Sequence, residues 1–141
     1  HSSGSGGTHA GFVLGASIAL KDALIVGIDI DAEPERVRAE VASCTKAAAT
    51  LLGVPFPESR IEVVAGHAGP AYGVPHAATI EAIKLAGALG GLVLDPVYTG
   101  KGLAGLIALI RQGRWRAGQH VIFLHTGGMP ALFAYESALP I

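Results

Sequence analysis

The sequence has little cysteine, few charged residues and no long apolar run. Its single cysteine, Cys44, excludes an internal disulfide and favours a reducing compartment, so we expect the protein in the cytoplasm. Charged residues make up 15% of the 141 residues and leave a formal net charge of -1, which gives no basis for a nucleic-acid partner. The apolar runs are far shorter than the ~20 residues of a transmembrane helix, so we expect no membrane partner and a small ligand.

Several motifs of well-known catalytic and binding sites are missing as well. The histidines show no metal-ligand spacing such as HxxxH and there is no cysteine cluster, so we expect no metal. The chain has neither a GxxxxGK[ST] nor a GxGxxG stretch, which disfavours a nucleoside triphosphate or a dinucleotide as the ligand. Without a GxSxG stretch, a hydrolase triad has no nucleophile.

The sequence does have ample material for a core, because half of its residues are hydrophobic and its mean hydropathy is +0.49. Strand and helix patterns alternate along it. The patterns predict strands at 23–30, 61–65, 91–94 and 120–124, and helices at 10–20, from 34 to a stop at 53, around 80–87, at 101–112 and at 130–134. This order predicts an α/β fold with a mostly parallel open sheet and helices on both faces, in which ligands bind beyond the carboxyl ends of the strands.

The opening stretch SGSGGT is rich in glycine and hydroxyl side chains. Glycines let the backbone curl until several N–H groups point at one anion, and the helix expected at 10–20 would add the positive end of its dipole. The stretch is therefore interpreted as a phosphate-binding loop formed by Gly4, Ser5, Gly6, Gly7 and Thr8. A tag remnant or flexible linker is the alternative, which the direct continuation into a helix disfavours. We expect the strand that usually precedes such a loop to be missing, because only His1 and Ser2 stand before it.

Two tyrosines lie in turn-rich segments. Tyr98 in DPVYTGK follows an expected strand, which places its phenol at the ligand edge, although a phenol with a pKa of about 10 needs a cation or hydrogen bonds before it acts as a base. Tyr72 in GPAYGVP has the same interpretation, and for both the alternative is a packed phenol that donates one hydrogen bond. Lys101 is expected to be a solvated lysine in the first turn of a helix, the alternative being a cation that favours a phenolate at Tyr98.

Two threonines stand beside glycines at expected strand ends. They are Thr99 in DPVYTGK and Thr126 in HTGG, where Gly127 follows. Their hydroxyls are candidates for ligand contact, and capping or turn bonding is the alternative.

Four stretches together resemble a known enzyme family. The stretches SGSGGTHAG, GPAYGVP, LDPVYTGKGLAGLI and FLHTGGMPALFAY, in this order, are similar to the C-terminal part of the pyridoxal-phosphate enzymes that include D-cysteine desulfhydrase, L-cysteate sulfo-lyase and 1-aminocyclopropane-1-carboxylate deaminase. The resemblance covers almost the whole chain and is strongest from 66 to 135. It implies pyridoxal 5'-phosphate as cofactor and the tryptophan-synthase-β-like fold of fold type II, incomplete at the N-terminus.

The resemblance also implies roles for the candidate residues. The loop from Gly4 to Thr8 would bind the cofactor phosphate, Tyr98 and Tyr72 would be the catalytic tyrosines, and Thr99, Thr126 and Gly127 would contact the cofactor. The cyclopropane deaminases carry Glu at the position of Thr99 and Leu at that of Thr126. A threonine leaves the pyridine nitrogen neutral, and a neutral ring is a weaker electron sink that suffices for a good leaving group on Cβ.

The resemblance therefore implies α,β-elimination from a small amino acid. We expect D-cysteine to give pyruvate, sulfide and ammonia, with L-cysteate and 1-aminocyclopropane-1-carboxylate as alternative substrates and a homo-oligomer as the native form. The family's Schiff-base lysine lies in GGNKTRK-like and GGxQSNH-like stretches that this sequence lacks. Residues 1–141 are thus expected to be the C-terminal part of the large cofactor-binding domain, without the small domain, inactive alone and prone to self-association. The alternative is a non-catalytic module that binds a phosphorylated ligand.

Overall fold

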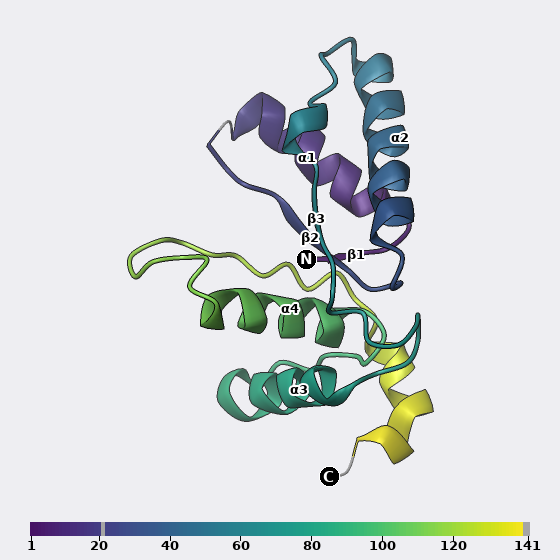
Figure 1. Ribbon diagram of the computed structural model, residues 1–141, viewed down its shortest axis with the longest axis vertical. Helices are drawn as coiled ribbons and strands as arrows, with labels where there is room; N and C mark the ends of the chain where they lie inside the picture. Colours follow the sequence, from purple (N-terminus) through teal and green to yellow (C-terminus); the bar gives the residue numbers. More distant parts are fainter. Residues whose placement is uncertain (21, 140–141) are drawn as a thin grey trace.

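The first half of the chain forms a parallel sheet (Figure 1), seen in a computed structural model that describes residues 1–20 and 22–139. Strands β1 (Ser2–Ser3), β2 (Val26–Asp29) and β3 (Glu62–Val64) pair in the order β1-β2-β3, both pairs being parallel. The predicted parallel sheet is confirmed. The expectation of a missing lead-in strand is wrong, because Ser2 and Ser3 pair with Ile28 and Asp29 directly before the glycine loop.

Two helices cover one face of this sheet. Helix α1 (Gly7–Ala19) connects β1 to β2, and helix α2 (Pro34–Leu52) connects β2 to β3. Pro34 stands in the first turn of α2, where its missing N–H costs nothing, and Gly53 ends the helix in a left-handed conformation. A buried apolar cluster joins α1, α2 and the start of β3; its members are Val13, Val37, Val41 and Ile61.

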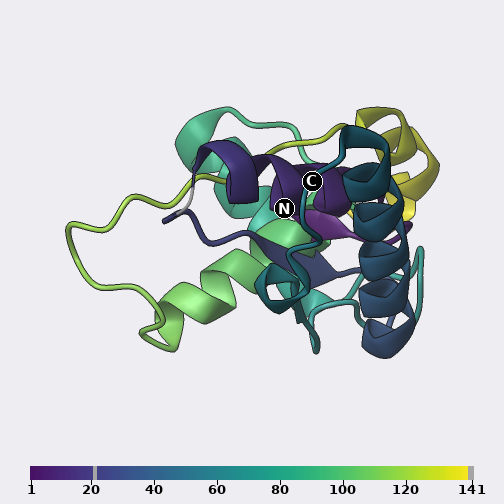
Figure 2. The ribbon, with the colours of Figure 1, turned by 90° about the horizontal axis from the view of Figure 1, so that it is seen from above.

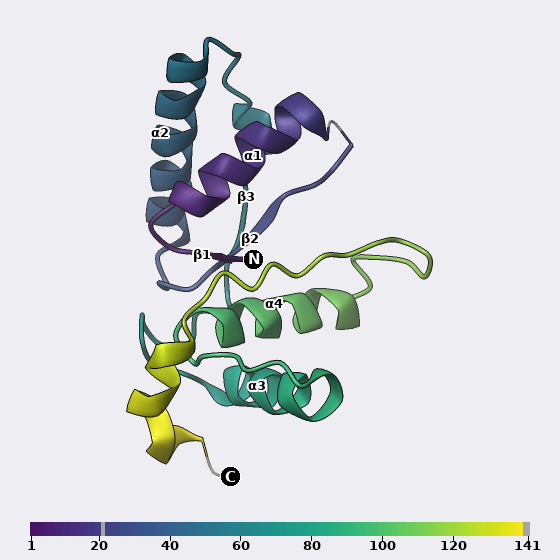
Figure 3. The same ribbon diagram turned by 180° about the vertical axis from the view of Figure 1, so that it is seen from behind.

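Helices α3 (Ala77–Gly90) and α4 (Thr99–Arg111) lie on the other face (Figure 3). Helix α4 packs against β1 and β2, and α3 packs against α4. Two glycines allow α4 to approach the strands closely: a Cβ at Gly105 would lie 2.6 Å from Ile28 Cγ2, and one at Gly102 would collide with the Ser2 hydroxyl. This packing holds the first turn of α4, and Tyr98 before it, beside the end of β1.

Two segments predicted as strands are not strands. Residues 91–94 and 120–124 make no sheet pairing in the structure, and Gly91 is the left-handed residue that ends α3. A strand exists only where a neighbour satisfies its backbone groups. Residues 113–119 instead form turns, after which the chain runs back beside α4 (Figures 1 and 3). Ile122 is 80% exposed as a result.

The remaining elements of the described residues are two 3-10 helices, η1 (Glu58–Arg60) and η2 (Met129–Ala138). The helix predicted at 130–134 is therefore present as the longer η2. Seen from above, α2 stands at one side of the molecule and the loop after α4 reaches out at the other (Figure 2). No helix within 1–20 and 22–139 combines the length and the apolar character needed to cross a membrane.

Candidate active site at the carboxyl end of the sheet

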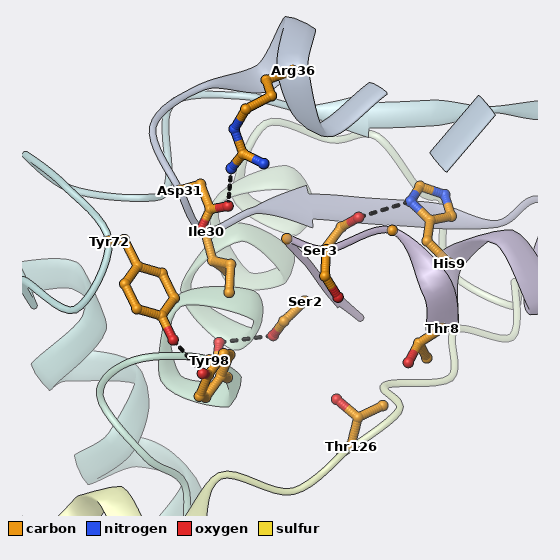
Figure 4. A pocket seen from close by; sticks show the side chains of 13 residues that line it. Ser2, Ser3, Thr8, His9, Ile30, Asp31, Arg36, Tyr72, Tyr98 and Thr126 are labelled. Carbon is orange, nitrogen blue, oxygen red and sulfur yellow. Dashed lines mark hydrogen bonds and ion pairs between the residues drawn. The ribbon is translucent and has the colours of Figure 1, made fainter. Parts of the chain in front are cut away.

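A pocket of about 370 Å³ lies where β1 and β2 end and α1 begins (Figure 4). Small-molecule pockets usually measure about 300–1,000 Å³. Its wall contains seven of the ten predicted site residues: Gly4, Ser5, Gly6, Thr8, Tyr72, Tyr98 and Thr126. The fold thus brings together four segments that are distant in the sequence, at the edge of the sheet where the strand-end rule expects a ligand.

The glycine loop turns the chain from β1 into α1. Gly6 has φ +86°, and a Cβ there would lie 2.8 Å from the backbone nitrogen of Val41, so α2 leaves room only for glycine. The first hydrogen bond of α1 is donated by Ala10 N to Gly6 O, at 2.8 Å, and no side chain caps the helix start. The preceding N–H groups, those of Gly7, Thr8 and His9, are therefore available to an anion at the positive end of the helix.

His9 is buried next to this loop and is hydrogen-bonded to Ser3. Its side chain is 1% exposed, and its Nδ1 lies 3.0 Å from the Ser3 hydroxyl. Burial lowers the pKa of His9 to about 4, with the terminal amine and Arg38 adding smaller effects of the same sign. The imidazole is therefore neutral at pH 7 and acts as a packing and hydrogen-bonding group rather than as a cation for the bound anion.

Tyr72 and Tyr98 lie together on one side of the pocket, and their hydroxyls are hydrogen-bonded (Figure 4). Their ring centroids are 5.9 Å apart with an interplanar angle of 69°. The hydrogen bond to Tyr98 is the largest of several causes that raise the pKa of Tyr72 to about 12. The hydrogen bond and the raised pKa both favour the neutral Tyr72 phenol. Tyr72 is therefore better suited to donating a proton than to acting as a base in its phenolate form.

The turn that carries Tyr98 is organised by Asp95. The buried Asp95 carboxylate accepts hydrogen bonds from the backbone N–H groups of Val97, Tyr98 and Thr99, at 2.7–2.8 Å, and from the Thr99 hydroxyl at 2.7 Å. Thr99 is itself fully buried and is not part of the pocket wall. Its hydroxyl proton is therefore committed to Asp95, which corresponds to turn bonding, the alternative to ligand contact for this residue.

The HTGG turn also contributes to the pocket wall. Thr126 lines the pocket, whereas Gly127, with φ +106°, follows it outside the wall. Gly128 packs directly against the Asp95 carboxylate, and His125 Nε2 lies 2.9 Å from the Val93 carbonyl oxygen. These contacts attach the turn to the segment before α4. Of the predicted site residues, Gly7, Thr99 and Gly127 are those that the structure leaves outside the wall.

Sequence reasoning missed six residues of the wall: Ser2, Ser3, His9, Ile30, Asp31 and Arg36. Ile30 and Asp31 could have been found, because Ile30 ends a strand that the sequence predicts and Asp31 directly follows it. Ser2 and Ser3 were hidden by the expectation that no strand precedes the loop. Arg36 is paired with Asp31 and, at 2.6 Å, with Glu33, so its charge is largely balanced.

The expectation for Lys101 is wrong. The side chain is completely buried rather than solvated, and its Nζ donates hydrogen bonds to the carbonyl oxygens of Ala71, at 2.8 Å, and Ile30, at 3.3 Å. The first turn of α4 faces the sheet and not the solvent, which the local sequence does not show. Metal-binding clusters of three or more His, Cys, Asp or Glu side chains are absent from the part of the chain that the structure describes.

Comparisons with known proteins agree with this geometry. Residues 1–127 match the family described as "Pyridoxal-phosphate dependent enzyme". The chain is 43% identical over 134 residues to a D-cysteine desulfhydrase of Yersinia pestis (strain Pestoides F), covering 95% of this chain and 41% of that protein. It is 40% identical over 135 residues to a probable 1-aminocyclopropane-1-carboxylate deaminase of Schizosaccharomyces pombe (strain 972 / ATCC 24843), covering 94% and 40%.

A solved structure shares the fold as well. The crystal structure of a protein described as an ACC deaminase homologue superposes with a TM-score of 0.88 at 37% sequence identity, covering 97% of this chain and 41% of that one. The chain therefore spans about two fifths of the length of the relatives that it matches.

Proposed function

This chain belongs to the family of pyridoxal-phosphate-dependent enzymes, and from this premise we propose that it is part of a longer lyase that eliminates sulfide from D-cysteine. The proposal places residues 1–141 in the C-terminal part of the large cofactor-binding domain. The remaining part of the enzyme would supply the small domain and the lysine that holds the cofactor covalently.

The residues of the pocket fit pyridoxal phosphate. A doubly charged phosphate matches the uncapped N-terminus of α1, where Gly6 leaves space that a Cβ would fill. We propose that Gly4, Ser5, Gly6, Gly7 and Thr8 bind the phosphate through backbone N–H groups and hydroxyls. Thr126 would contact the ring nitrogen, while Gly127 shapes that turn and Thr99 acts through Asp95.

One observation carries the choice of reaction: the described pocket wall has Asp31 as its one acidic side chain, and Asp31 is hydrogen-bonded to Arg36. No carboxylate there is free to keep a pyridine nitrogen protonated, and a threonine hydroxyl does not protonate it. When bound, pyridoxal phosphate supplies an electron sink for the α-carbon of an amino acid. The residues of this chain keep that sink weak, which suffices when the leaving group on Cβ is a thiolate.

The tyrosine pair then handles protons at its hydroxyl oxygens. Tyr98 Oη and Tyr72 Oη share a hydrogen bond, so a proton given up by one can be replaced from the other. We propose that Tyr98 donates to the departing sulfur and that Tyr72 orients Tyr98. In the overall reaction D-cysteine and one water give pyruvate, hydrogen sulfide and ammonia. The Cα–H, Cβ–S and Cα–N bonds are broken, and the oxygen of the water becomes the keto oxygen of pyruvate.

The experiment is a direct comparison of substrates on the full-length enzyme loaded with pyridoxal phosphate. Sulfide from D-cysteine is the expected product. Sulfite from L-cysteate would identify the sulfonate as the substrate instead, with the same elimination. 2-Oxobutyrate from 1-aminocyclopropane-1-carboxylate would overturn the argument from the threonines. A protein that retains a phosphorylated ligand and turns over none of the three would be the non-catalytic module.

We further propose a homo-oligomer in the cytoplasm. Several large apolar side chains are more than 60% exposed; they are Leu20, Leu51, Leu52, Leu89, Ile122 and Phe133. Apolar surface of this kind favours association with more protein. Sedimentation of the full-length enzyme as a compact monomer would contradict the oligomer.

A further inference from the structure

Lys101 is a buried cation whose position the proposed chemistry does not explain. Its side chain is 0% exposed, although lysine is almost never fully buried. It also stands in the first turn of α4, where the helix dipole disfavours a positive charge. Burial lowers the pKa of Lys101, while the nearby carboxylates of Asp31 and Asp29 oppose this shift. The hydrogen bonds that Lys101 donates must therefore offset the free-energy cost of burying its positive charge.

Those contacts join three segments of the pocket. Lys101 Nζ donates to Ala71 O at 2.8 Å and to Ile30 O at 3.3 Å. Ala71 directly precedes Tyr72, Ile30 lines the pocket at the end of β2, and the α4 turn that carries Lys101 begins directly after Tyr98. One ammonium group therefore links the loop that carries Tyr72 to the end of β2 and to the first turn of α4.

We propose that Lys101 is a positioning residue, which ties the loop of residues 66–76 to the end of β2 and so keeps the Tyr72 hydroxyl against the Tyr98 hydroxyl. Its Nζ is not part of the pocket wall, so it acts through Tyr72 and not on the substrate. Tyr135 makes a second attachment, donating to Gly73 O at 2.6 Å. Without Lys101 the loop keeps the attachment through Tyr135, so we expect it to become more mobile but to stay in place.

Hydrogen exchange tests the tether without any reaction. In the full-length protein, Lys101→Met keeps an unbranched side chain of similar volume and removes the donors; replacing a buried charge by an apolar group of similar volume is compatible with folding. We expect amides of residues 66–76 to exchange about tenfold faster, with α1 and α2 unchanged. The matched control is Lys46→Met, which alters an exposed lysine of α2 and should leave the loop unchanged.

A double-mutant cycle tests the catalytic consequence, which rests on the proposed function. Lys101→Met should lower kcat about tenfold in the wild-type background, because a misplaced catalytic group loses rate steeply, and by less than twofold in a Tyr72→Phe background. An equal loss in both backgrounds, or wild-type exchange in the loop, overturns the proposal. If the wild-type enzyme has no lyase activity, the proposed function fails while the exchange experiment still decides the tether.

Fast exchange throughout the molecule would mean that the methionine variant is unfolded. The same exchange measurement is then made on Lys101→Gln, whose amide is one atom shorter and does not span both carbonyl oxygens. Faster exchange confined to residues 66–76 supports the tether in that variant, and exchange at the wild-type rate overturns it.

Discussion

The anion side of the pocket is built from backbone, whereas the tyrosine side is built from side chains. At the start of α1 the groups that face a ligand are N–H groups, held by the fold of the Gly4–Thr8 loop against α2. On the other side, two phenols meet through a hydrogen bond between residues 26 positions apart. The two sides should therefore be sensitive to different substitutions. An added Cβ at Gly6 should disrupt the anion side, whereas removal of a single hydroxyl should disrupt the tyrosine side.

Gly6→Ala should have the largest effect. An alanine at φ +86° is strained, and its Cβ would lie 2.8 Å from Val41 N, where only backbone can yield. We expect the variant to lose about 2–4 kcal/mol of unfolding free energy, measured in urea on the full-length protein, together with most of its affinity for inorganic phosphate. Gly7→Ala is the matched control, because nothing lies within 4 Å of its Cβ. Equal losses in the two variants would contradict the backbone-built cradle.

Tyr98→Phe should leave the anion side intact and disable the other. Removing a proton donor from the reaction lowers kcat by about 100-fold, whereas the affinity for pyridoxal phosphate should stay within about threefold of wild type. Tyr72→Phe should cost less, about tenfold, if it acts by orienting Tyr98. The measurements are steady-state kinetics with D-cysteine and spectroscopic titration of the cofactor. A loss of cofactor affinity as large as the loss of kcat would show that the two sides are not separate.

Features that depend on local sequence could be predicted, whereas features that depend on contacts between distant residues could not. Helix α2 was predicted from local signals, the apolar spacing between Pro34 and the stop at Gly53, and these suffice for a helix. The glycine loop is equally local, and four of its five predicted residues line the pocket. The strands predicted at 91–94 and 120–124 depend on neighbours elsewhere, and the described chain offers them none.

The tyrosine side depends on contacts between distant residues, which a single sequence does not contain. The sequence singled out Tyr72 and Tyr98, but not that their hydroxyls meet. It placed Lys101 in solvent because the first turn of a helix is usually exposed, and only the packing of α4 against the sheet buries it. Thr99 shows the same limit, since its partner Asp95 is nearby in sequence but its burial is set by the whole fold.

His9 makes the anion side sensitive to acid. Its folded pKa of about 4 lies below the ordinary 6.5, so the unfolded chain takes up the proton first, and stability falls as pH drops from about 6.5 to about 4. The loss amounts to at most about 1.4 kcal/mol per pH unit. Comparing urea unfolding at pH 7 and pH 5, we expect His9→Gln to flatten this dependence, and His120→Gln, an exposed control, to leave it unchanged. An unaltered slope in His9→Gln would show that the histidine is not the sensor.

The smallest expected effect concerns the ionisation of Tyr72. Its pKa of about 12 has the hydrogen bond with Tyr98 as the largest cause, so Tyr98→Phe should move it toward the ordinary 10. At pH 11 the Tyr72 phenol would then change from about 10% to about 90% ionised. NMR of tyrosine labelled at the ring carbon next to the hydroxyl measures this, with Tyr72→Phe identifying the resonance. A pKa that stays near 12 would assign the shift to desolvation and to the nearby Asp31, and the two phenols would then act as separate groups rather than as one hydrogen-bonded pair.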